Sequence, residues 1–501
     1  MRLLGRATGF FQGPRRPHKC GVPVGFGTPR LCGSKAFCRA LGLLGCAILV
    51  LTVAGCAVGP NYRRPPDTGP ESFRGAGTQT NSLGDYAWWR LFNDSALQQL
   101  IHIALTNNYD IRIAAARVAQ ARAIWAENRS LFLPQVNYQG WIGRGKNAEY
   151  NTPFTTVPPT ASAMYADGTV SWELDLFGRI RRLNESARAQ FLASQEARRG
   201  VTAMLVSDVA QAYFQLLALD EELRIAQEST NSFGQSLKIF TQRYRGGVAS
   251  KLEVASAEAL EAAAATSALD LQRQIVAQED LISVLLGLNP GPVARGGALL
   301  AEALPPEVPP GLPSALLERR PDIRQAEENL RSANALVGVA KADFFPRLTL
   351  TALLGQTSTE LSTFTAGANN AWSIASGLSG PIFQGGLLKA QYRAARAAWD
   401  EARLQYQSTI LTAFREVADA LAARQQLAAE RVQQTRAVAA YQEAVKVASE
   451  RYVRGRASYY EVLQEQQLLF PAENTLTQIQ LNQLLAVVQL YRALGGGWSG
   501  P

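Results

Sequence analysis

The sequence of 501 residues is poor in the residue types on which enzymes and disulfide-bonded secreted proteins depend. All five cysteines lie at or before Cys56, so no disulfide can form beyond that position. His102 is the only histidine after Cys56, and no cysteine nucleophile, serine elbow or metal-ligand spacing accompanies it. Gly143-Arg144-Gly145 lacks the third glycine of a dinucleotide fingerprint. We therefore predict a protein that is not an enzyme, with no catalytic, cofactor-binding or metal site, and a fold held together by packing.

Acidic residues are absent from the first 55 positions, which contain eight basic residues. Without this segment the net charge of +9 falls to +1, so the body of the chain is nearly neutral. A nucleic-acid partner is therefore not expected. The basic residues are Arg2, Arg6, Arg15, Arg16, Lys19, Arg30, Lys35 and Arg39.

An apolar run from Leu41 to Ala54 follows the basic segment and leads into Cys56 through small residues. Its 14 residues fall short of the ~20 that a membrane-spanning helix needs, which is the alternative interpretation. A short apolar core followed by small residues and a cysteine is typical of a lipoprotein signal peptide. We therefore predict that residues 1–55 are cleaved and that Cys56 carries a diacylglycerol and an N-acyl chain, with no other cofactor.

After Cys56 the same series of sequence motifs occurs twice. Arg243-Tyr244 and Gly247 recur 208 residues later as Arg451-Tyr452 and Gly455. A tandem duplication is the simplest explanation. The predicted divisions are an extended Pro- and Gly-rich segment over 56–97, a first repeat over 98–300 and a second repeat over 301–501.

Helical periodicity over 98–128 and 315–342 gives way to strand alternation near 134–177 and near 346–383, and each repeat then returns to helix. The alternation places apolar side chains on one face of the strands and polar side chains on the other. The apolar set is Val170, Trp172, Leu174, Leu176, Leu348, Leu350, Trp372, Ile374 and Leu378. The opposite set is Thr169, Ser171, Glu173, Asp175, Arg347, Thr349, Thr351, Ala371, Ser373, Ala375 and Ser379.

Proline is missing from two long stretches, between Pro159 and Pro290 and between Pro381 and Pro471, so continuous helices are possible there. A strict 3.5-residue apolar repeat in the first stretch requires a neighbouring helix along its whole length. Pro471 falls inside the last predicted helix, where it should remove one backbone hydrogen bond and kink the chain. The repeat consists of Leu205, Val209, Ala212, Leu216, Leu219, Leu223 and Ala226.

Four amphipathic strands per chain cannot close a barrel in lipid, because open edges would leave backbone amides unpaired in hydrocarbon. Two chains would supply eight strands and a filled interior, whereas three would supply twelve and leave a lumen. A homotrimeric pore follows if the strands span a membrane. The alternative is a soluble protein in which the hairpins form a small sandwich.

Across nearly the whole chain after the cysteine cluster, the sequence resembles the outer membrane factors, the TolC-like family, in its nodulation-type lipoprotein branch. The motifs that carry the resemblance are specific in combination. They are Cys56-Ala57-Val58-Gly59-Pro60-Asn61-Tyr62, Trp88-Trp89, Trp172-Glu173-Leu174-Asp175-Leu176-Phe177-Gly178, Arg319-Arg320-Pro321-Asp322-Ile323, the two Arg-Tyr-x-x-Gly motifs, and Leu494-Gly495-Gly496-Gly497-Trp498.

The resemblance implies a trimeric twelve-stranded transmembrane β-barrel that continues into a long periplasmic α-helical coiled-coil barrel. Such a protein would lie in the outer membrane of a Gram-negative bacterium, anchored by its lipid. It would be the channel of a tripartite efflux or export system, with a periplasmic membrane-fusion adaptor and an inner-membrane pump of the resistance-nodulation-division type. The alternative is a lipid-anchored periplasmic coiled-coil adaptor or tether protein without a pore.

The resemblance also implies a periplasmic gate formed by Tyr452, Tyr460, Glu461 and Gln464. Three copies of Glu461 around a narrow mouth would repel one another and attract cations. Gln464 stands where the family often has a second aspartate, so only one acidic ring is expected. Alternatively, Glu461 lies on a solvated helix face. Glu253 is its counterpart in the first repeat.

The two Arg-Tyr pairs are the predicted contacts for the adaptor, because adaptor tips in the family dock near these turns. The alternative is that they cap helices and fix the turns, with glycines supplying the backbone freedom. The residues concerned are Arg243, Tyr244, Arg451 and Tyr452.

Overall fold

The computed structural model describes residues 57–66, 94–145, 161–301, 313–496. All of them belong to the second of two compact units, Cys56–Pro501. The predicted signal segment 1–55, the lipidation site Cys56, and the motif residues Trp88, Trp89 and Trp498 lie outside the described residues.

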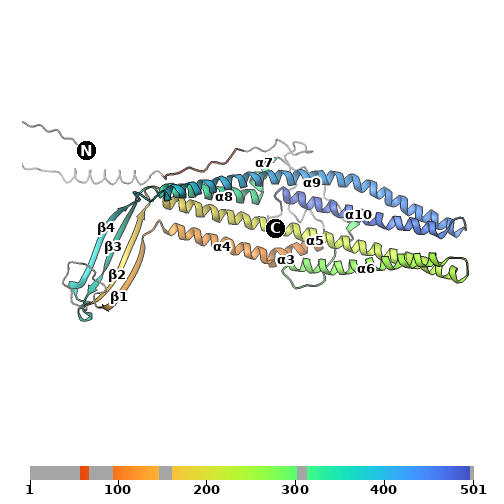
Figure 1. Cartoon of the computed structure of the whole chain (residues 1–501), viewed down its shortest axis with the longest axis horizontal. Helices are drawn as coiled ribbons and strands as arrows, with labels where there is room; N and C mark the ends of the chain where they lie inside the picture. The colour runs from red at the N-terminus through yellow and green to blue at the C-terminus, as the bar shows by residue number, and fades with distance from the viewer. Residues whose placement is uncertain (1–56, 67–93, 146–160, 302–312, 497–501) are drawn as a thin grey trace, which may run out of the picture. The chain divides into compact units, whose positions relative to one another are not determined.

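The predicted tandem repeat is confirmed by the order and length of the elements (Figure 1). Corresponding helices of the two repeats have equal lengths of 22, 67 and 35 residues. The first repeat contains α4 (Tyr109–Ser130), β1 (Gln135–Gly145), β2 (Ala161–Leu174), α5 (Arg179–Arg245) and α6 (Lys251–Leu285). The second contains α8 (Pro321–Ala342), β3 (Arg347–Ser358), β4 (Asn370–Ser379), α9 (Leu387–Val453) and α10 (Tyr459–Ala493).

Glycines mark the same two junctions in both repeats. Gly178 and Gly386 precede the 67-residue helices with positive φ angles of 84° and 90°. Gly247 and Gly455, with φ of 77° and 69°, lie in the turns that follow those helices. Both pairs are 208 residues apart, so the turns where only glycine fits without strain are duplicated together with the helices.

The short helices α3 (Ser95–Asn107) and α7 (Pro313–Arg319) precede α4 and α8. The helical periodicity of the sequence continues across both junctions, yet the structure breaks the helix at each. Asn108 ends α3 and caps α4, because its side chain accepts hydrogen bonds from the backbone N–H groups of Asp110 and Ile111. In the second repeat Pro321 occupies the first position of α8, where its missing N–H costs nothing.

The four strands form one antiparallel sheet in the order β1-β2-β3-β4. The register confirms the two faces that the alternation predicts, except at Asp175 and Leu176, which lie beyond the end of β2 at Leu174. One row runs Val136, Val170, Ala352 and Ile374, whereas the next residue on each strand gives the row Gln135, Ser171, Thr351 and Ala375. The apolar face is open to the surroundings in the single chain, since Tyr138 is 92% exposed and Ile374 81% exposed.

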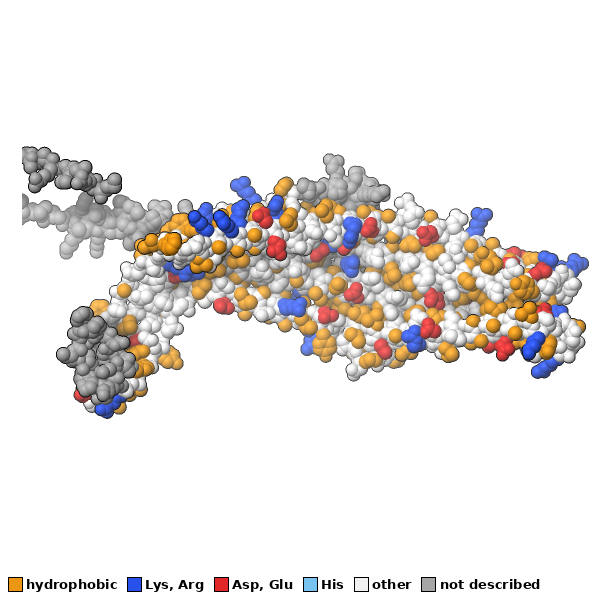
Figure 2. Space-filling view, viewed as in Figure 1, with side chains coloured by type: hydrophobic (Ala, Val, Ile, Leu, Met, Phe, Trp, Pro, Cys, Tyr) orange, Lys and Arg blue, Asp and Glu red, His pale blue; other side chains and the backbone are white. Residues whose placement is uncertain are grey.

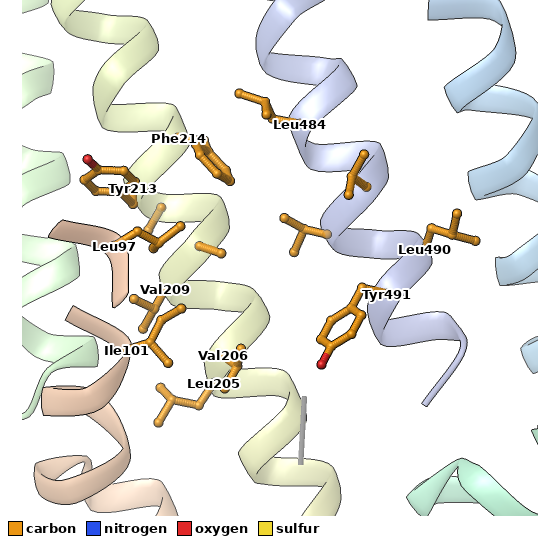
Figure 3. Close-up of a cluster of buried hydrophobic side chains, with 14 of the residues drawn as sticks. Leu97, Ile101, Leu205, Val206, Val209, Tyr213, Phe214, Leu484, Leu490 and Tyr491 are labelled. Atoms are coloured by element: carbon orange, nitrogen blue, oxygen red, sulfur yellow. The ribbon is translucent and has the colours of Figure 1, made fainter. Parts of the chain in front are cut away.

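The main hydrophobic core lies where α3, α5 and α10 meet (Figure 3). Leu97 and Ile101 of α3 pack against Val209 and Tyr213 of α5, and Tyr491 of α10 lies in the same cluster. The predicted 3.5-residue repeat of α5 is buried at Leu205, Val209, Ala212, Leu216 and Ala226 and partly buried at Leu219 and Leu223. A window of α5 is apolar enough to cross a membrane, but 67% of it is buried in the protein, as in a core helix.

Pro471 lies inside α10, which continues through it for its full 35 residues. Two side chains support the backbone around this position. Gln434 of α9 donates to the carbonyl oxygen of Ala472 at 2.8 Å, and Thr475 donates to the carbonyl oxygen of Pro471 at 2.9 Å. The neighbouring Phe470 packs edge-on against Phe233 of α5, with ring centroids 5.6 Å apart. The surrounding helices therefore stabilise α10 at the residue that breaks its own hydrogen-bond pattern.

Arg320 connects three parts of the second repeat. Its buried guanidinium lies 2.6 Å from Asp322 at the start of α8 and 2.8 Å from Glu416 of α9. It also donates to the carbonyl oxygen of Ala493 at 3.0 Å, at the last residue of α10. The Arg-Arg-Pro-Asp-Ile motif thus fixes the start of α8 against α9 and the end of α10.

Replacing Arg320 with Met should lower the free energy of unfolding by about 2–4 kcal/mol. This is somewhat less than for a fully buried pair, because Asp322 and Glu416 are partly exposed. Arg454→Met, which removes an exposed pair with Glu450, should cost below ~1 kcal/mol. Unfolding in detergent, followed by far-UV circular dichroism, measures both, and equal losses would contradict the role of Arg320.

Candidate functional site

The turn between α5 and α6 lies beside the turn between α9 and α10, at the end of the helices far from the sheet (Figure 1). The residues under the two turns form one hydrophobic cluster. Charged side chains of both signs gather on the visible surface at this end (Figure 2). The cluster contains Phe233, Phe240 and Ala257 from the first repeat and Ala448, Tyr459, Val462 and Leu463 from the second.

Tyr459 is the centre of this cluster, and the sequence analysis missed it. Its hydroxyl lies 2.8 Å from the hydroxyl of Ser236 on α5, and its ring packs edge-on against Phe240 at 5.3 Å and Tyr452 at 4.8 Å. The signal was present in the helical spacing. Tyr459, Val462 and Leu463 share one helix face, whereas the adjacent Tyr460, which was predicted, lies on the other side and is 67% exposed.

Two of the predicted adaptor-contact residues connect the turns. The Arg243 guanidinium donates to the Tyr452 hydroxyl at 3.5 Å, so an α5 residue reaches the end of α9. Tyr244 and Arg451 point outward, with Tyr244 47% exposed. Arg243 and Tyr452 thus support the turn as the alternative interpretation expects. Adaptor contact stays a prediction for all four residues.

Glu253 and Glu461 occupy equivalent positions but make different contacts. Glu253 completes a capping box with Ser250: the Ser250 N–H donates to Glu253 Oε2 at 2.6 Å, and the Glu253 N–H donates to Ser250 Oγ at 3.2 Å. The backbone and side-chain hydrogen bonds from Ser250 lower the pKa of Glu253. At Ser458 no side chain caps the helix, and Glu461 instead lies 3.7 Å from Arg451.

Glu461 is therefore held less firmly than its counterpart. Its side chain is 44% exposed and that of Arg451 is 55% exposed, so the pair is a weak surface ion pair. Gln464, one turn further along α10, is also exposed. The predicted gate residues Tyr460, Glu461 and Gln464 thus share an accessible surface on the first turns of α10, and their role as a gate stays a prediction.

Residues 57–66 form a second feature near the opposite end of the helices. The Val58 N–H donates to the carbonyl oxygen of Phe177, just before α5, at 3.0 Å. Gly59, with φ of 106°, lies so close to α8 that a Cβ there would be 2.5 Å from the Cα of Gly338. Tyr62 donates to Glu327 of α8 at 3.1 Å. The extended segment is thus fixed against α5 and α8, and its first described residue lies where the sheet meets the helices.

The surroundings of Tyr62 change the pKa of its hydroxyl. Burial, followed by the charge of Glu327 and the hydrogen bond to it, raises the pKa of the Tyr62 hydroxyl well above its usual range. Arg64 completes the attachment with ion pairs of 2.6 Å to Glu318 and Glu327. Arg331 lies over the Tyr62 ring, 4.9 Å from its centre. Residues 57–66 are therefore held in place by contacts with the helices.

Comparisons with known proteins agree with this architecture. Residues 100–288 and 312–496 match the family described as outer membrane efflux protein. The toluene efflux pump outer membrane protein TtgC of Pseudomonas putida is 35% identical over 464 residues, 91% of this chain and 96% of the relative. The probable outer membrane lipoprotein SilC of Salmonella typhimurium is 32% identical over 454 residues, 90% of this chain and 97% of the relative. The MtrE outer membrane channel of Neisseria gonorrhoeae, solved in its open state, superposes with a TM-score of 0.79 at 29% identity, covering 88% of this chain and 99% of that one.

The ionisation of Glu473 makes the stability of the helical part depend on pH. The carboxylate lies on α10, accepts a hydrogen bond from Gln442 of α9 at 3.1 Å, and faces Glu221, Arg224 and Glu228 of α5. Burial raises its pKa, and the charges of Glu228 and Glu221 raise it further, against the opposing effects of Gln442 and Arg224. A raised pKa means that the folded state binds this proton more tightly than the unfolded state does.

The contribution of Glu473 to stability should therefore be complete below the usual Glu pKa of ~4.3 and be lost as the pH rises through its higher folded pKa. Glu473→Gln removes the charge but keeps an oxygen for Gln442, so it should stabilise the protein at neutral pH and have little effect at acidic pH. Glu443→Gln, at an exposed pair with Lys446, is the control. Thermal unfolding across the pH range measures the effect, and a Glu473→Gln protein that is less stable at neutral pH would contradict it.

Proposed function

Because the chain belongs to the outer membrane efflux protein family, we propose that it is the outer-membrane channel of a tripartite efflux or export system. A periplasmic membrane-fusion adaptor and an inner-membrane pump of the resistance-nodulation-division type would deliver its substrates. The relative TtgC is named as the outer membrane protein of a toluene efflux pump. The matched family is one of efflux proteins, which supports transport over enzymatic chemistry.

The observation that carries this proposal is the sheet. Its strands of 10 to 14 residues have the length that tilted transmembrane strands need. One face is mainly apolar, with Tyr138, Leu354 and Ile374 strongly exposed, and the other carries most of the polar side chains. Exposing such an apolar face to water is unfavourable. In a membrane barrel the apolar face would contact lipid and the polar face would line a water-filled lumen.

The internal repeat supports a homotrimer. Helix α8 packs against α9 of its own repeat and against α5 of the preceding repeat. Helix α4 packs against α5 of its own repeat, and the repeat that precedes it can only come from another copy of the chain. We infer that α4 of one subunit packs on α9 of the next as α8 packs on α5. Three copies then close a barrel of twelve strands with a lumen.

The repeat also identifies which residues should meet at this interface. Ser186 of α5 and Ser332 of α8 are buried with their hydroxyls 2.8 Å apart. Their counterparts are Ala394, 208 residues after Ser186, and Gln120, 212 residues before Ser332. Both counterparts are exposed in the single chain, as expected for a contact that a neighbouring subunit completes.

The double variant Gln120→Cys, Ala394→Cys should therefore form disulfides between subunits under mild oxidation. The rest of the chain after Cys56 has no cysteine, so no other disulfide competes beyond that position. A covalent trimer should be the largest species on non-reducing gels, and each single variant should stay monomeric. Ile113→Cys with Ala394→Cys is the matched control, since it displaces one thiol by two helical turns, roughly 10 Å. A ladder beyond trimer, or equal crosslinking of the control, would contradict the arrangement.

A lipid on Cys56 fits the position of the segment that follows it. The fixed residues 57–66 begin beside Phe177 and Gly178, directly after strand β2. A diacylglycerol and N-acyl chain on Cys56 would thus enter the membrane at the level where the barrel begins. The acyl chains would then lie in the periplasmic leaflet, next to the barrel that spans both leaflets.

A Cys56→Ser protein, exported with a non-lipoprotein signal peptide, should stay in the membrane, require detergent for extraction and form conducting pores in planar bilayers. The barrel is expected to suffice for insertion because it alone satisfies the strand edges in lipid. The wild-type protein is the control for yield and conductance. Release of the variant into the soluble fraction would favour the alternative, a periplasmic tether without a pore.

At the other end we propose that Tyr452, Tyr460, Glu461 and Gln464 form the periplasmic gate. The weak pairing of Glu461 with Arg451 supports this role. The Glu461 carboxylate is exposed and takes no part in capping its own helix, so it can face a lumen. Arg243, Tyr244, Arg451 and Tyr452 are the proposed contacts for the adaptor. Their position on two adjacent turns, one from each repeat, supports a docking surface there.

A further inference from the structure

The basic residues at the start of the two 67-residue helices have different surroundings. In the first repeat Arg181 of α5 forms a 3.2 Å ion pair with Asp175, which follows β2. The positions 208 residues later are Lys389 of α9 and Phe383. The second repeat thus has the basic residue, but an exposed phenylalanine stands in the place of its acidic partner.

Lys389 begins a basic stripe on α9. The stripe continues with Arg393 and Arg396, and the spacings of four and three residues place all three on one face of the helix. All three side chains are exposed, and none of the described carboxylates pairs with Lys389 or Arg393. Arg396 lies over the ring of Trp399, 5.4 Å from its centre, a contact that leaves its charge uncancelled. Basic side chains gather on the visible surface where the helices meet the sheet (Figure 2).

In the proposed channel this basic stripe lies on the outer surface of α9. Residues 57–66 mark the outer surface of α5, because the anchor that precedes them can enter lipid only outside the lumen. Arg182 of α5 donates to Asn61 of this segment at 2.8 Å and forms a 2.7 Å ion pair with Glu185. Arg393 is the counterpart of Glu185, 208 residues later. The face of α9 that carries Arg393 is therefore turned outward as well.

The basic stripe also begins at the depth where lipid head groups would lie. Lys389 and Arg396 are the third and tenth residues of α9, so they lie roughly 3 Å and 14 Å along the helix axis from its first residue. On the membrane side, Ile382 is the counterpart of Leu174 on the apolar face and is almost fully exposed. The head-group layer of one leaflet is about 5–8 Å thick, and long basic side chains can extend toward it. Apolar surface and uncompensated positive charge thus follow each other as the acyl chains and the phosphate do in a phospholipid.

We propose that Lys389, Arg393 and Arg396 bind the head group of an anionic phospholipid of the periplasmic leaflet, with its acyl chains against Ile382. The inference rests on the proposed function, because that function places the sheet in lipid and the start of α9 at the membrane surface. Arginine matches phosphate oxygens through paired N–H donors, and lysine adds a mobile point charge. A homotrimer would have three such sites.

This lipid would give the second repeat a link to the membrane that the first repeat already has. On the α5 side, the segment 57–66 connects the helices to the covalent anchor through Tyr62 and Arg64. The outward face of α9 has no counterpart of that segment among the described residues. A phospholipid held by the basic stripe would fix the α9 side at the same level.

Native mass spectrometry of the purified, lipidated trimer tests the proposal. Dioleoylphosphatidylglycerol and dioleoylphosphatidylcholine, added separately, have the same acyl chains but differ in net charge. The wild-type trimer should retain up to three phosphatidylglycerol molecules and bind them several-fold more tightly than phosphatidylcholine, with a preference that falls as ammonium acetate is raised. The triple variant Lys389→Gln, Arg393→Gln, Arg396→Gln should lose most of this preference.

Arg403→Gln is the matched control. Arg403 also lies on α9, 5.7 Å from the centre of the Trp399 ring, but it pairs with Asp400 at 3.5 Å and is farther from the sheet. This variant should keep the preference for phosphatidylglycerol. Glycerol phosphate at the same concentration should not displace the lipid, because it lacks the acyl chains. Displacement by glycerol phosphate would show a site for free phosphate and overturn the assignment to a lipid.

Phe383→Asp provides a second measurement that removes no basic side chain, and it decides the question if the triple variant fails to assemble. It restores the carboxylate that Arg181 has in the first repeat, so it should neutralise Lys389 and lower the preference about as much as Lys389→Gln does.

Equal binding of the two lipids by the wild-type trimer would overturn this inference and leave the channel intact. A preference that survives both the triple variant and Phe383→Asp would do the same. A wild-type protein that is monomeric and forms no conducting pore would instead overturn the proposed function.

Discussion

The unpaired backbone groups at the two edges of a four-stranded sheet are the constraint on which the structure depends. In lipid each unsatisfied N–H or C=O costs several kcal/mol, so β1 and β4 cannot remain free edges. The internal pairings are complete over 10 or 11 residues per strand pair, which leaves only those two edges open. The number of subunits and the presence of a lumen both depend on which strands of other subunits pair with β1 and β4.

The long helices must also bury their apolar surface, and they do so by packing against several neighbours. A helix of 67 residues has far more surface than one neighbour can cover, and α5 contacts α3, α4, α6, α8 and α10. Its central part is buried by the cluster around Tyr213, while its ends pair with the second repeat through Ser332 near the sheet and Tyr459 at the turns. The two repeats are thus joined along the whole of α5, and neither is a separate domain.

Much of this architecture could be predicted from the sequence, because its main signals are periodic. The alternation in the strands gave the correct faces, and the 3.5-residue repeat from Leu205 to Ala226 marked a buried seam. The break at Asn108 was missed, since helical periodicity continues across it and only the capping contacts of its side chain reveal the interruption. Tertiary contacts of single side chains do not appear in a periodic pattern.

The candidate site shows the same limit. The motif led to Tyr460, whereas the helix phase places Tyr459 in the core of the turns. Likewise the repeat equates Glu253 with Glu461, yet one is held in a capping box and the other in a surface ion pair. Sequence equivalence identified the positions correctly, but the contact that each residue makes depends on its neighbours: Ser250 caps its helix through its side chain and Ser458 does not.

The equal lengths of α5 and α9 restrict how such a chain can change over time. One inserted residue would rotate everything beyond it by about 100° and move it about 1.5 Å along the helix axis. In α5 alone, this would turn the Tyr459 partner Ser236 away from α10 and bring its turn out of level with that of α9. Insertions and deletions in these helices should therefore survive only in pairs, one in each repeat, or in multiples that restore the helix phase.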